Sequence, residues 1–146
     1  MSRQTGRHFL QIPGPTNTPL AVLAAIAKPT IDHRGPEFGR LGLQVLADIR
    51  TIFKTRQPVI IYPASGTGAW EAALVNVLSP GDQVLMAETG WFATLWKTMA
   101  ARLQLDTTFI EGDCWSGIHA SQIEARLADD KQHRMKAVAV VHNETS

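Results

Sequence analysis

The stretch "PASGTGAWEAALVNVLSPGD", residues 63–82, lies where a short apolar run ends and a helical pattern begins. Two hydroxyl residues and two glycines occupy the junction, at Ser65, Gly66, Thr67 and Gly68. Free backbone N–H groups and the positive end of a helix dipole favour an anion at such a junction, and glycine lets the backbone approach it closely. The stretch therefore predicts either a phosphate site or an ordinary helix cap, since serine and glycine begin many helices.

Three better-known glycine motifs do not fit this junction. A nucleoside-triphosphate loop needs a lysine after its second glycine, where this chain has Ala69. A dinucleotide fingerprint needs a third glycine where Glu71 stands, and a nucleophile elbow needs glycine where Pro63 stands. A monophosphate is therefore the better ligand among these, although the turn taken alone favours a simple helix cap.

The sequence around the junction predicts an α/β fold. Short apolar runs rich in branched residues alternate with helical patterns, which indicates βαβ units and a mostly parallel sheet. Near-continuous apolar runs also fit strands that are buried on both faces. The expected strands are residues 59–64, 83–88, 106–111 and 137–142, and the expected helices are residues 67–78, 90–105 and 121–128.

The first part of the chain has a different pattern. Residues 11–19 contain three prolines and a glycine, which predicts extended or turned backbone. Helical patterns follow at residues 19–28 and from Pro36, where apolar residues recur at mostly three- and four-residue steps. We therefore expect an N-terminal arm with helices over residues 1–57 and the beginning of an α/β domain over residues 58–146.

Composition excludes several functional classes. The chain has 146 residues and a formal net charge of +1, which argues against binding to nucleic acid or to a membrane surface. No apolar run approaches the length that spans a bilayer, and the first residues contain no secretory signal. The single cysteine, Cys114, fits a reducing compartment, so we expect a cytoplasmic protein.

Small, polar and aromatic residues follow each expected strand. In an open α/β sheet, ligands bind beyond the carboxyl ends of the strands. Trp91 and Phe92 come directly after the second expected strand, in "ETGWFATLW". Either ring could stack on a flat ligand or could belong to the core, and the residues alone leave both readings open.

Five motifs together resemble one family. "PGPT", "DHRGPEF", "SGTGAWEAALVNVLSPGD", "ETGWFATLW" and "VHNETS" are similar, in this order and spacing, to the N-terminal part of the serine–glyoxylate and alanine–glyoxylate aminotransferases. These are class V, fold-type I enzymes that use pyridoxal 5'-phosphate. The resemblance implies an incomplete large domain of a fold-type I aminotransferase, which moves an amino group from serine or alanine to glyoxylate.

The resemblance also assigns residues to the cofactor. Ser65, Gly66 and Thr67 match the turn that grips the cofactor phosphate, in agreement with the helix-terminus argument. Phe92 matches the aromatic residue that stacks on the pyridine ring. Thr145 matches a hydroxyl residue that contacts both the cofactor and the substrate.

Other residues match the family's substrate-binding and dimer segments. His33 and Arg34 match a loop that reaches the active site of the neighbouring subunit, and Gly14 matches an N-terminal segment near the substrate entrance. The resemblance therefore implies a homodimeric complete enzyme whose partners are amino-acid and 2-oxo-acid substrates, with no metal.

One departure from the family concerns the lysine that forms the Schiff base. In the family this lysine comes well after the "HNET" motif, so we expect no catalytic residue in this chain and no activity from the chain alone. Two alternatives stay open: a non-catalytic partner that dimerises with a longer homologue, and another fold-type I enzyme such as a lyase or desulfurase. A desulfurase is disfavoured because Cys114 comes too early and too near an expected strand. The five lysines are Lys28, Lys54, Lys97, Lys131 and Lys136.

Overall fold

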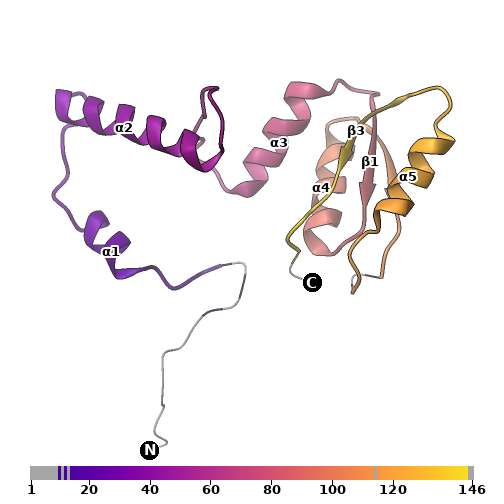
Figure 1. The fold of residues 1–146 in the computed structure, drawn as a ribbon, viewed down its shortest axis with the longest axis horizontal. Helices are drawn as coiled ribbons and strands as arrows, with labels where there is room; N and C mark the ends of the chain where they lie inside the picture. The colour runs from indigo at the N-terminus through magenta and orange to yellow at the C-terminus, as the bar shows by residue number, and fades with distance from the viewer. Residues whose placement is uncertain (1–9, 11, 13, 114, 145–146) are drawn as a thin grey trace, which may run out of the picture. The chain divides into compact units, whose positions relative to one another are not determined.

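The computed structural model describes residues 10, 12, 14–113 and 115–144, and the chain divides into two compact units. The first unit ends at Ile61 and the second begins at Tyr62. Figure 1 shows helices alone in the first unit and a sheet with helices in the second.

Two helices form the regular structure of the first unit, α1 (Leu20–Ile26) and α2 (Pro36–Ile52). Pro36 at the first position of α2 has a φ angle suited to a helix start, and Gly35 is the N-cap residue. Glu37 in the first turn and Arg50 in the last turn complement the helix dipole. The local sequence therefore accounts for both ends of α2.

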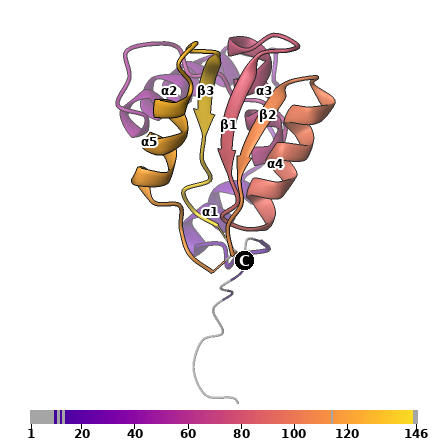
Figure 2. The same cartoon turned by 90° about the vertical axis from the view of Figure 1, so that its right-hand side faces the viewer.

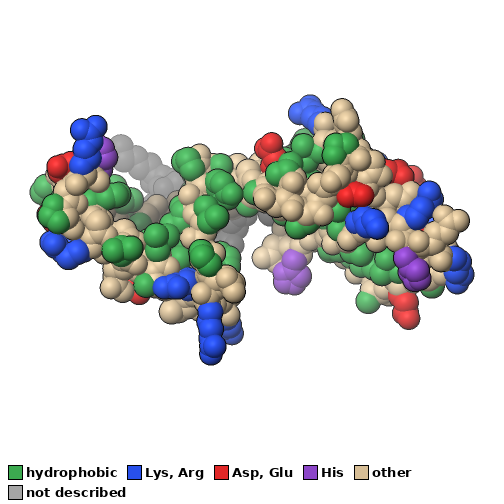
Figure 3. All heavy atoms as spheres, turned by 90° about the horizontal axis from the view of Figure 1, so that it is seen from above, with side chains coloured by type: hydrophobic (Ala, Val, Ile, Leu, Met, Phe, Trp, Pro, Cys, Tyr) green, Lys and Arg blue, Asp and Glu red, His purple; other side chains and the backbone are tan. Residues whose placement is uncertain are grey.

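The apolar side chains of the first unit are exposed. None of the described residues up to Ile61 is buried, because two helices alone cannot enclose a core. Green apolar side chains are accordingly visible at the surface of this unit in Figure 3. The most exposed large apolar side chains are those of Leu20 (78%), Ile52 (76%), Ile26 (73%) and Leu43 (72%).

The second unit contains a three-stranded parallel sheet with helices on both faces, as the sequence predicts. The strand order is β2-β1-β3, and both neighbours of β1 run parallel to it. Figure 2 shows the three strands pointing in one direction, with α5 and α4 on either side of them. The elements are α3 (Gly66–Val77), β1 (Gln83–Ala87), α4 (Trp91–Arg102), β2 (Asp106–Ile110), α5 (Ala120–Asp129) and β3 (Met135–Ala139).

The central strand β1 holds the core together. Val84 and Met86 pack into a cluster with residues of α3 and α4, including Leu74 and Ala100. The alternate residues Leu85 and Ala87 pack on the other face, in a cluster that includes Ile123 of α5. Successive strand residues point to opposite faces, so an apolar run with every residue buried requires cover on both sides.

The prediction of a strand at residues 59–64 is wrong. This segment has no strand structure, and Ile60, Ile61 and Tyr62 are exposed. A strand exists only where its backbone groups pair with a neighbour, and in the described sheet neither β2 nor β3 pairs with this segment. A run of apolar branched residues indicates the tendency to form a strand but cannot supply the partner.

The last strand is also displaced from its predicted place. β3 spans Met135–Ala139, earlier than the predicted 137–142, because its register against β1 places Met135 opposite Gln83 and Ala139 opposite Met86. The residues after Ala139 therefore form a loop at the carboxyl end of the sheet.

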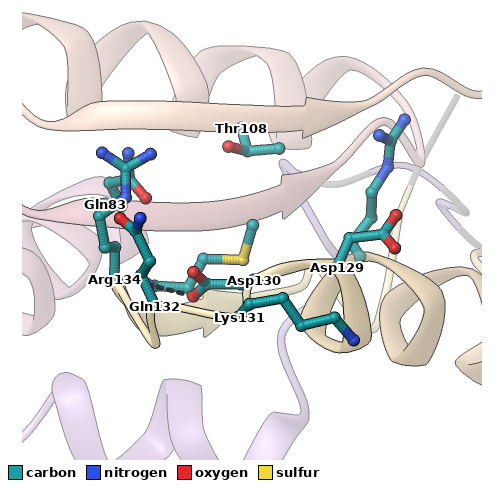
Figure 4. A pocket seen from close by; sticks show the side chains of 9 residues that line it. Gln83, Thr108, Asp129, Asp130, Lys131, Gln132 and Arg134 are labelled. Atoms are coloured by element: carbon teal, nitrogen blue, oxygen red, sulfur yellow. Dashed lines mark hydrogen bonds between the residues drawn. The ribbon is translucent and has the colours of Figure 1, made fainter.

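Asp130 connects the end of α5 to the beginning of β3 (Figure 4). It is the C-cap residue of α5, and its carboxylate accepts a hydrogen bond of 2.8 Å from the backbone N–H of Met135. This bond, followed by the backbone N–H of Arg134, lowers the pKa of the Asp130 carboxyl below 3.8. Because the folded pKa is depressed, the charged carboxylate stabilises the fold above pH 3.8, and this contribution is lost as the pH falls through the folded pKa.

We predict that Asp130→Asn lowers the free energy of unfolding at neutral pH, because the charge-assisted hydrogen bond to Met135 becomes a neutral one. The difference from the wild-type chain should disappear at a pH below the folded pKa of Asp130, where the wild-type carboxyl is itself neutral. Urea unfolding at a series of pH values measures this difference. Asp129→Asn is the control, since among the described residues the Asp129 carboxylate accepts no hydrogen bond. An equal effect of both substitutions at every pH would contradict the prediction.

Candidate functional site

The carboxyl ends of the three parallel strands define one edge of the second unit. β1 leads through residues 88–90 into α4, and β2 leads into the loop 111–119. Residues 140–144 follow β3 at the same edge. Trp70, one turn from the start of α3, contacts Phe92 in the first turn of α4. Thr67, in the first turn of α3, lines a hollow of about 370 Å³ together with α4 residues that include Leu95 and Met99.

The N-terminus of α3 carries the three residues that the sequence assigns to a phosphate. Ser65 is the N-cap residue with extended backbone, and no side chain caps the helix. Among the described residues, no group accepts a hydrogen bond from the amides of Gly66 and Thr67. Ser65, Gly66 and Thr67 are all exposed, and a Cβ added at Gly66 would meet open space. Two amides, two hydroxyls and the helix dipole therefore face open space, a donor set that suits a phosphate group.

The second glycine of the turn has a different role from the first. A Cβ added at Gly68 would lie 2.7 Å from the Cβ of Ala64. The amide of Gly68 donates to the carbonyl of Ser65 at 3.0 Å, so it is already used within the turn. Gly66 therefore leaves space for a ligand, whereas Gly68 lets α3 pack closely on the preceding segment.

Phe92 lies in the first turn of α4 and is half-buried. Its ring packs edge-on against Trp70, with the ring centroids 6.0 Å apart and an angle of 70° between the planes. Trp70 in turn stacks on Trp96, with centroids 5.3 Å apart. Trp70 follows Thr67 by three residues, so the aromatic contact joins the start of α3 to the start of α4. The neighbouring Trp91 is 64% exposed.

The N-terminus of α4 is capped by a residue from the other end of the unit. The N-cap residue of α4 is Gly90, which has no side chain to cap the helix. The two carboxylate oxygens of Glu144 accept hydrogen bonds from the backbone N–H groups of Phe92 and Ala93, each at 3.1 Å. These are the second and third helical positions, whose amides an N-cap side chain normally satisfies. Glu144 therefore acts as the missing cap.

The N-termini of α3 and α4 thus differ in charge. The positive end of the α4 dipole is occupied by a carboxylate, and the positive end of the α3 dipole has no acidic residue in its first turn. An anionic ligand would be repelled from α4 and attracted to α3. The arrangement therefore favours the turn at Ser65 over the N-terminus of α4 as the anion site.

Residues that follow β1, β2 and β3 line a hollow of about 390 Å³ at the same edge. Thr89, His142 and Glu144 contribute polar groups to it, and Trp115 contributes an exposed indole. A hollow of similar size at the amino ends of the strands, drawn in Figure 4, is lined by Gln83, Met135 and charged residues of the loop after α5. Only the first of these two hollows lies where an α/β sheet binds its ligands.

The remaining predicted site residues lie in the first unit or outside the described residues. His33 and Arg34 are exposed in the first unit, where the backbone N–H of Arg34 donates to Asp32 at 2.9 Å. Gly14 also belongs to the first unit and has a φ of +147°. Thr145 lies outside the described residues. The assigned roles of these four residues stay predictions.

Two residues of the site were missed from the sequence. Trp70 could have been found from its spacing, since it follows the phosphate turn by one helical turn on the side that must face α4. Glu144 could have been found because α4 begins with a glycine N-cap, which has no side chain to cap it, and an acidic residue follows a neighbouring strand at the same edge.

Among the described residues, no cluster of three acidic, histidine or cysteine side chains could hold a metal ion. None of the described helices is long and apolar enough to cross a membrane.

Comparisons with known proteins place the chain in a class. No protein-family model matches it. The chain is 43% identical over 143 residues to the L-aspartate–glyoxylate aminotransferase of Paracoccus denitrificans, and 44% identical over 146 residues to the serine–glyoxylate aminotransferase of Methylorubrum extorquens. These matches cover 97% and 99% of this chain and 36% of each relative. The crystal structure of alanine–glyoxylate aminotransferase from Nostoc sp. superposes with a TM-score of 0.77 at 29% identity, covering 97% of this chain and 39% of that one.

The sequence matches and the fold therefore place the chain with the class V, fold-type I aminotransferases, to whose N-terminal part it corresponds. Within that class the chain corresponds to the glyoxylate aminotransferases, and it spans about a third of the length of the curated relatives it matches.

The close packing at Gly68 generates a prediction about the phosphate turn. Gly68→Ala should lower the free energy of unfolding by about 1–3 kcal/mol relative to Gly66→Ala, because only the methyl group at position 68 collides with Ala64. Alanine has a higher helix propensity than glycine, so both substitutions gain stability from this source, and most of that gain cancels when the two variants are compared. Denaturant unfolding of both proteins measures the difference. Equal stability of the two variants would show that Ala64 moves away without cost.

Proposed function

We propose that the chain is the front portion of a pyridoxal-phosphate-dependent transaminase that moves an amino group from serine or alanine to glyoxylate. The observation that carries the proposal is the open N-terminus of α3, which has free donors at Ser65, Gly66 and Thr67 close to the Phe92–Trp70 contact. The names of the three relatives given above support it, since each is called a glyoxylate aminotransferase and the three names differ in the amino donor.

The residues of the turn fit the phosphate of pyridoxal 5'-phosphate. The amides of Gly66 and Thr67 and the hydroxyls of Ser65 and Thr67 would hold the phosphate, whose two negative charges are favoured by the α3 dipole. Phe92 would lie against the pyridine ring, held in place by Trp70. The bound cofactor would supply an electron sink for the bond changes at the substrate's α-carbon. The described part of the chain would thus bind and orient the cofactor.

We propose that none of the five lysines of this chain forms the Schiff base. Lys28 and Lys54 belong to the first unit. In the second unit, the Nζ atom of Lys97 lies over the ring of Phe109 at 4.1 Å, and Lys131 lines the hollow at the amino ends of the strands. Lys136 is the second residue of β3, also near its amino end. The positions of the second-unit lysines support a cofactor-binding role for this chain without the chemical step.

We further propose that the complete enzyme is a cytoplasmic homodimer that uses amino-acid and 2-oxo-acid substrates. His33, Arg34 and Gly14 would contribute to substrate binding, and Thr145 to both substrate and cofactor binding, as the family resemblance implies. The exposed apolar side chains of α1 and α2 support an interface in the first unit. The same observation favours the second candidate function, a non-catalytic chain that pairs with a longer homologue.

The phosphate turn makes a direct prediction about cofactor binding. The wild-type chain should bind pyridoxal 5'-phosphate more tightly than pyridoxal, which has the ring but no phosphate. The double variant Ser65→Ala/Thr67→Val should reduce this preference by about tenfold or more, since a hydrogen bond to a charged group contributes about 1.5–3 kcal/mol. Quenching of tryptophan fluorescence by each ligand measures both affinities, because Trp70 lies beside the proposed site.

Ser79→Ala is the matched control, because it removes a hydroxyl just beyond the opposite end of α3. It should leave the preference for the phosphorylated ligand unchanged. A wild-type chain that binds both ligands equally, or a double variant with an unchanged preference, would refute the phosphate site.

The proposal about the lysines is tested separately. The chain alone should show no transamination of glyoxylate with serine or alanine, because no lysine is placed for the proton transfers. Borohydride reduction in the presence of the cofactor, followed by peptide mass spectrometry, should find no lysine modified stoichiometrically. Stoichiometric modification of one lysine that disappears in the Ser65→Ala/Thr67→Val variant would overturn this proposal.

A further inference from the structure

Glu144 connects two segments that are far apart in the sequence. Its carboxylate accepts hydrogen bonds from the amides of Phe92 and Ala93, across sequence separations of 52 and 51 residues. The contact is partly buried and lies at the carboxyl edge of the sheet. Because both oxygens are used, the carboxylate restrains two successive backbone amides of α4.

We propose that Glu144 is a positioning residue for the cofactor ring, acting through the backbone of Phe92. The position of an aromatic ring depends on where its backbone lies and on what its ring contacts. Glu144 holds the backbone amide of Phe92, and Trp70 holds its ring edge-on at 6.0 Å. This inference rests on the proposed function, because it concerns the ring that would lie against pyridoxal 5'-phosphate.

The local sequence of α4 explains why a distant residue is needed. Gly90 cannot cap the helix, and no acidic residue lies in the first turn of α4. Without Glu144 the first amides of α4 would lose their acceptor, and the first turn would fray. Phe92 lies in that first turn, so fraying would displace its ring from the face of the ligand. The turn at Ser65 lies on α3 and does not depend on this cap.

In the proposed role, Glu144 affects the binding of the cofactor ring but not the binding of the phosphate. Loss of Glu144 should lower the affinities for pyridoxal and for pyridoxal 5'-phosphate by the same factor, because only the ring contact that both ligands share is disturbed. A purely electrostatic role would give a different result. Removal of a negative charge near the site would strengthen binding of the phosphorylated ligand and leave pyridoxal unchanged.

The experiment measures the affinities of the 146-residue chain for pyridoxal and for pyridoxal 5'-phosphate in the wild type and in Glu144→Gln. We expect both affinities to fall by about three- to tenfold, with their ratio unchanged, as for the loss of one aromatic contact. Glu124→Gln, which makes the same charge change on an exposed residue of α5, should alter neither affinity. Unchanged binding of pyridoxal in Glu144→Gln would overturn the positioning role.

Hydrogen exchange supplies a readout that needs neither a cofactor nor a stable variant. Amides in the first turn of a helix normally exchange fast, because they have no acceptor within the helix. In the wild-type chain, the Phe92 and Ala93 amides should exchange more slowly than the Gly66 and Thr67 amides, which have no acceptor among the described residues. Equally fast exchange at all four amides would overturn the capping contact itself.

Failure of the inference can be distinguished from failure of the proposed function. A wild-type chain that binds neither ligand would contradict the proposed function and the positioning role that rests on it. A wild-type chain that binds both ligands, together with a Glu144→Gln variant that binds them equally well, would overturn the positioning role alone.

Discussion

The burial of β1 on both faces is the constraint on which the second unit depends. Val84 and Leu85 have no exposed surface, and they point to opposite sides of the sheet. A strand of this kind must pair at both edges and be covered by helices on both faces. That requirement fixes β2 and β3 as its parallel neighbours and thereby brings three strand ends to one edge. The loops that follow the strands and the N-terminus of α4 lie at that edge because of it.

The chemistry of the edge depends on which helix N-terminus is already neutralised. An uncapped helix N-terminus attracts anions whatever its sequence, so an uncapped α4 would compete with α3 for an anionic group. Glu144 removes this competition by capping α4, and the turn at Ser65 stays open. A residue that binds no ligand can thus influence where a ligand binds.

Sequence reasoning found the parts of this structure that depend on local pattern. The helices, the parallel sheet and the glycine turn follow from periodicity and from residues such as Pro36 and Gly66, and the family resemblance is confirmed by the comparisons. The strand expected at residues 59–64 was wrong because pairing is a property of two segments, and its sequence shows only one. Glu144 and Trp70 had weak local signals, in the glycine N-cap of α4 and in the spacing from Thr67, but neither signal shows the contact with α4 through which each residue acts.

The aromatic contacts and the carboxylate cap together explain how a single ring can be held firmly at an exposed edge. A loop residue at the end of a strand would normally be mobile, and a mobile ring stacks weakly because its order must be gained on binding. Phe92 is instead placed on a helix, with its amide bound to Glu144 and its ring against Trp70, which itself stacks on Trp96 of the core. Each restraint comes from a different element, so the ring is ordered before any ligand arrives. Preorganisation of this kind is what a cofactor site requires of the residues around it.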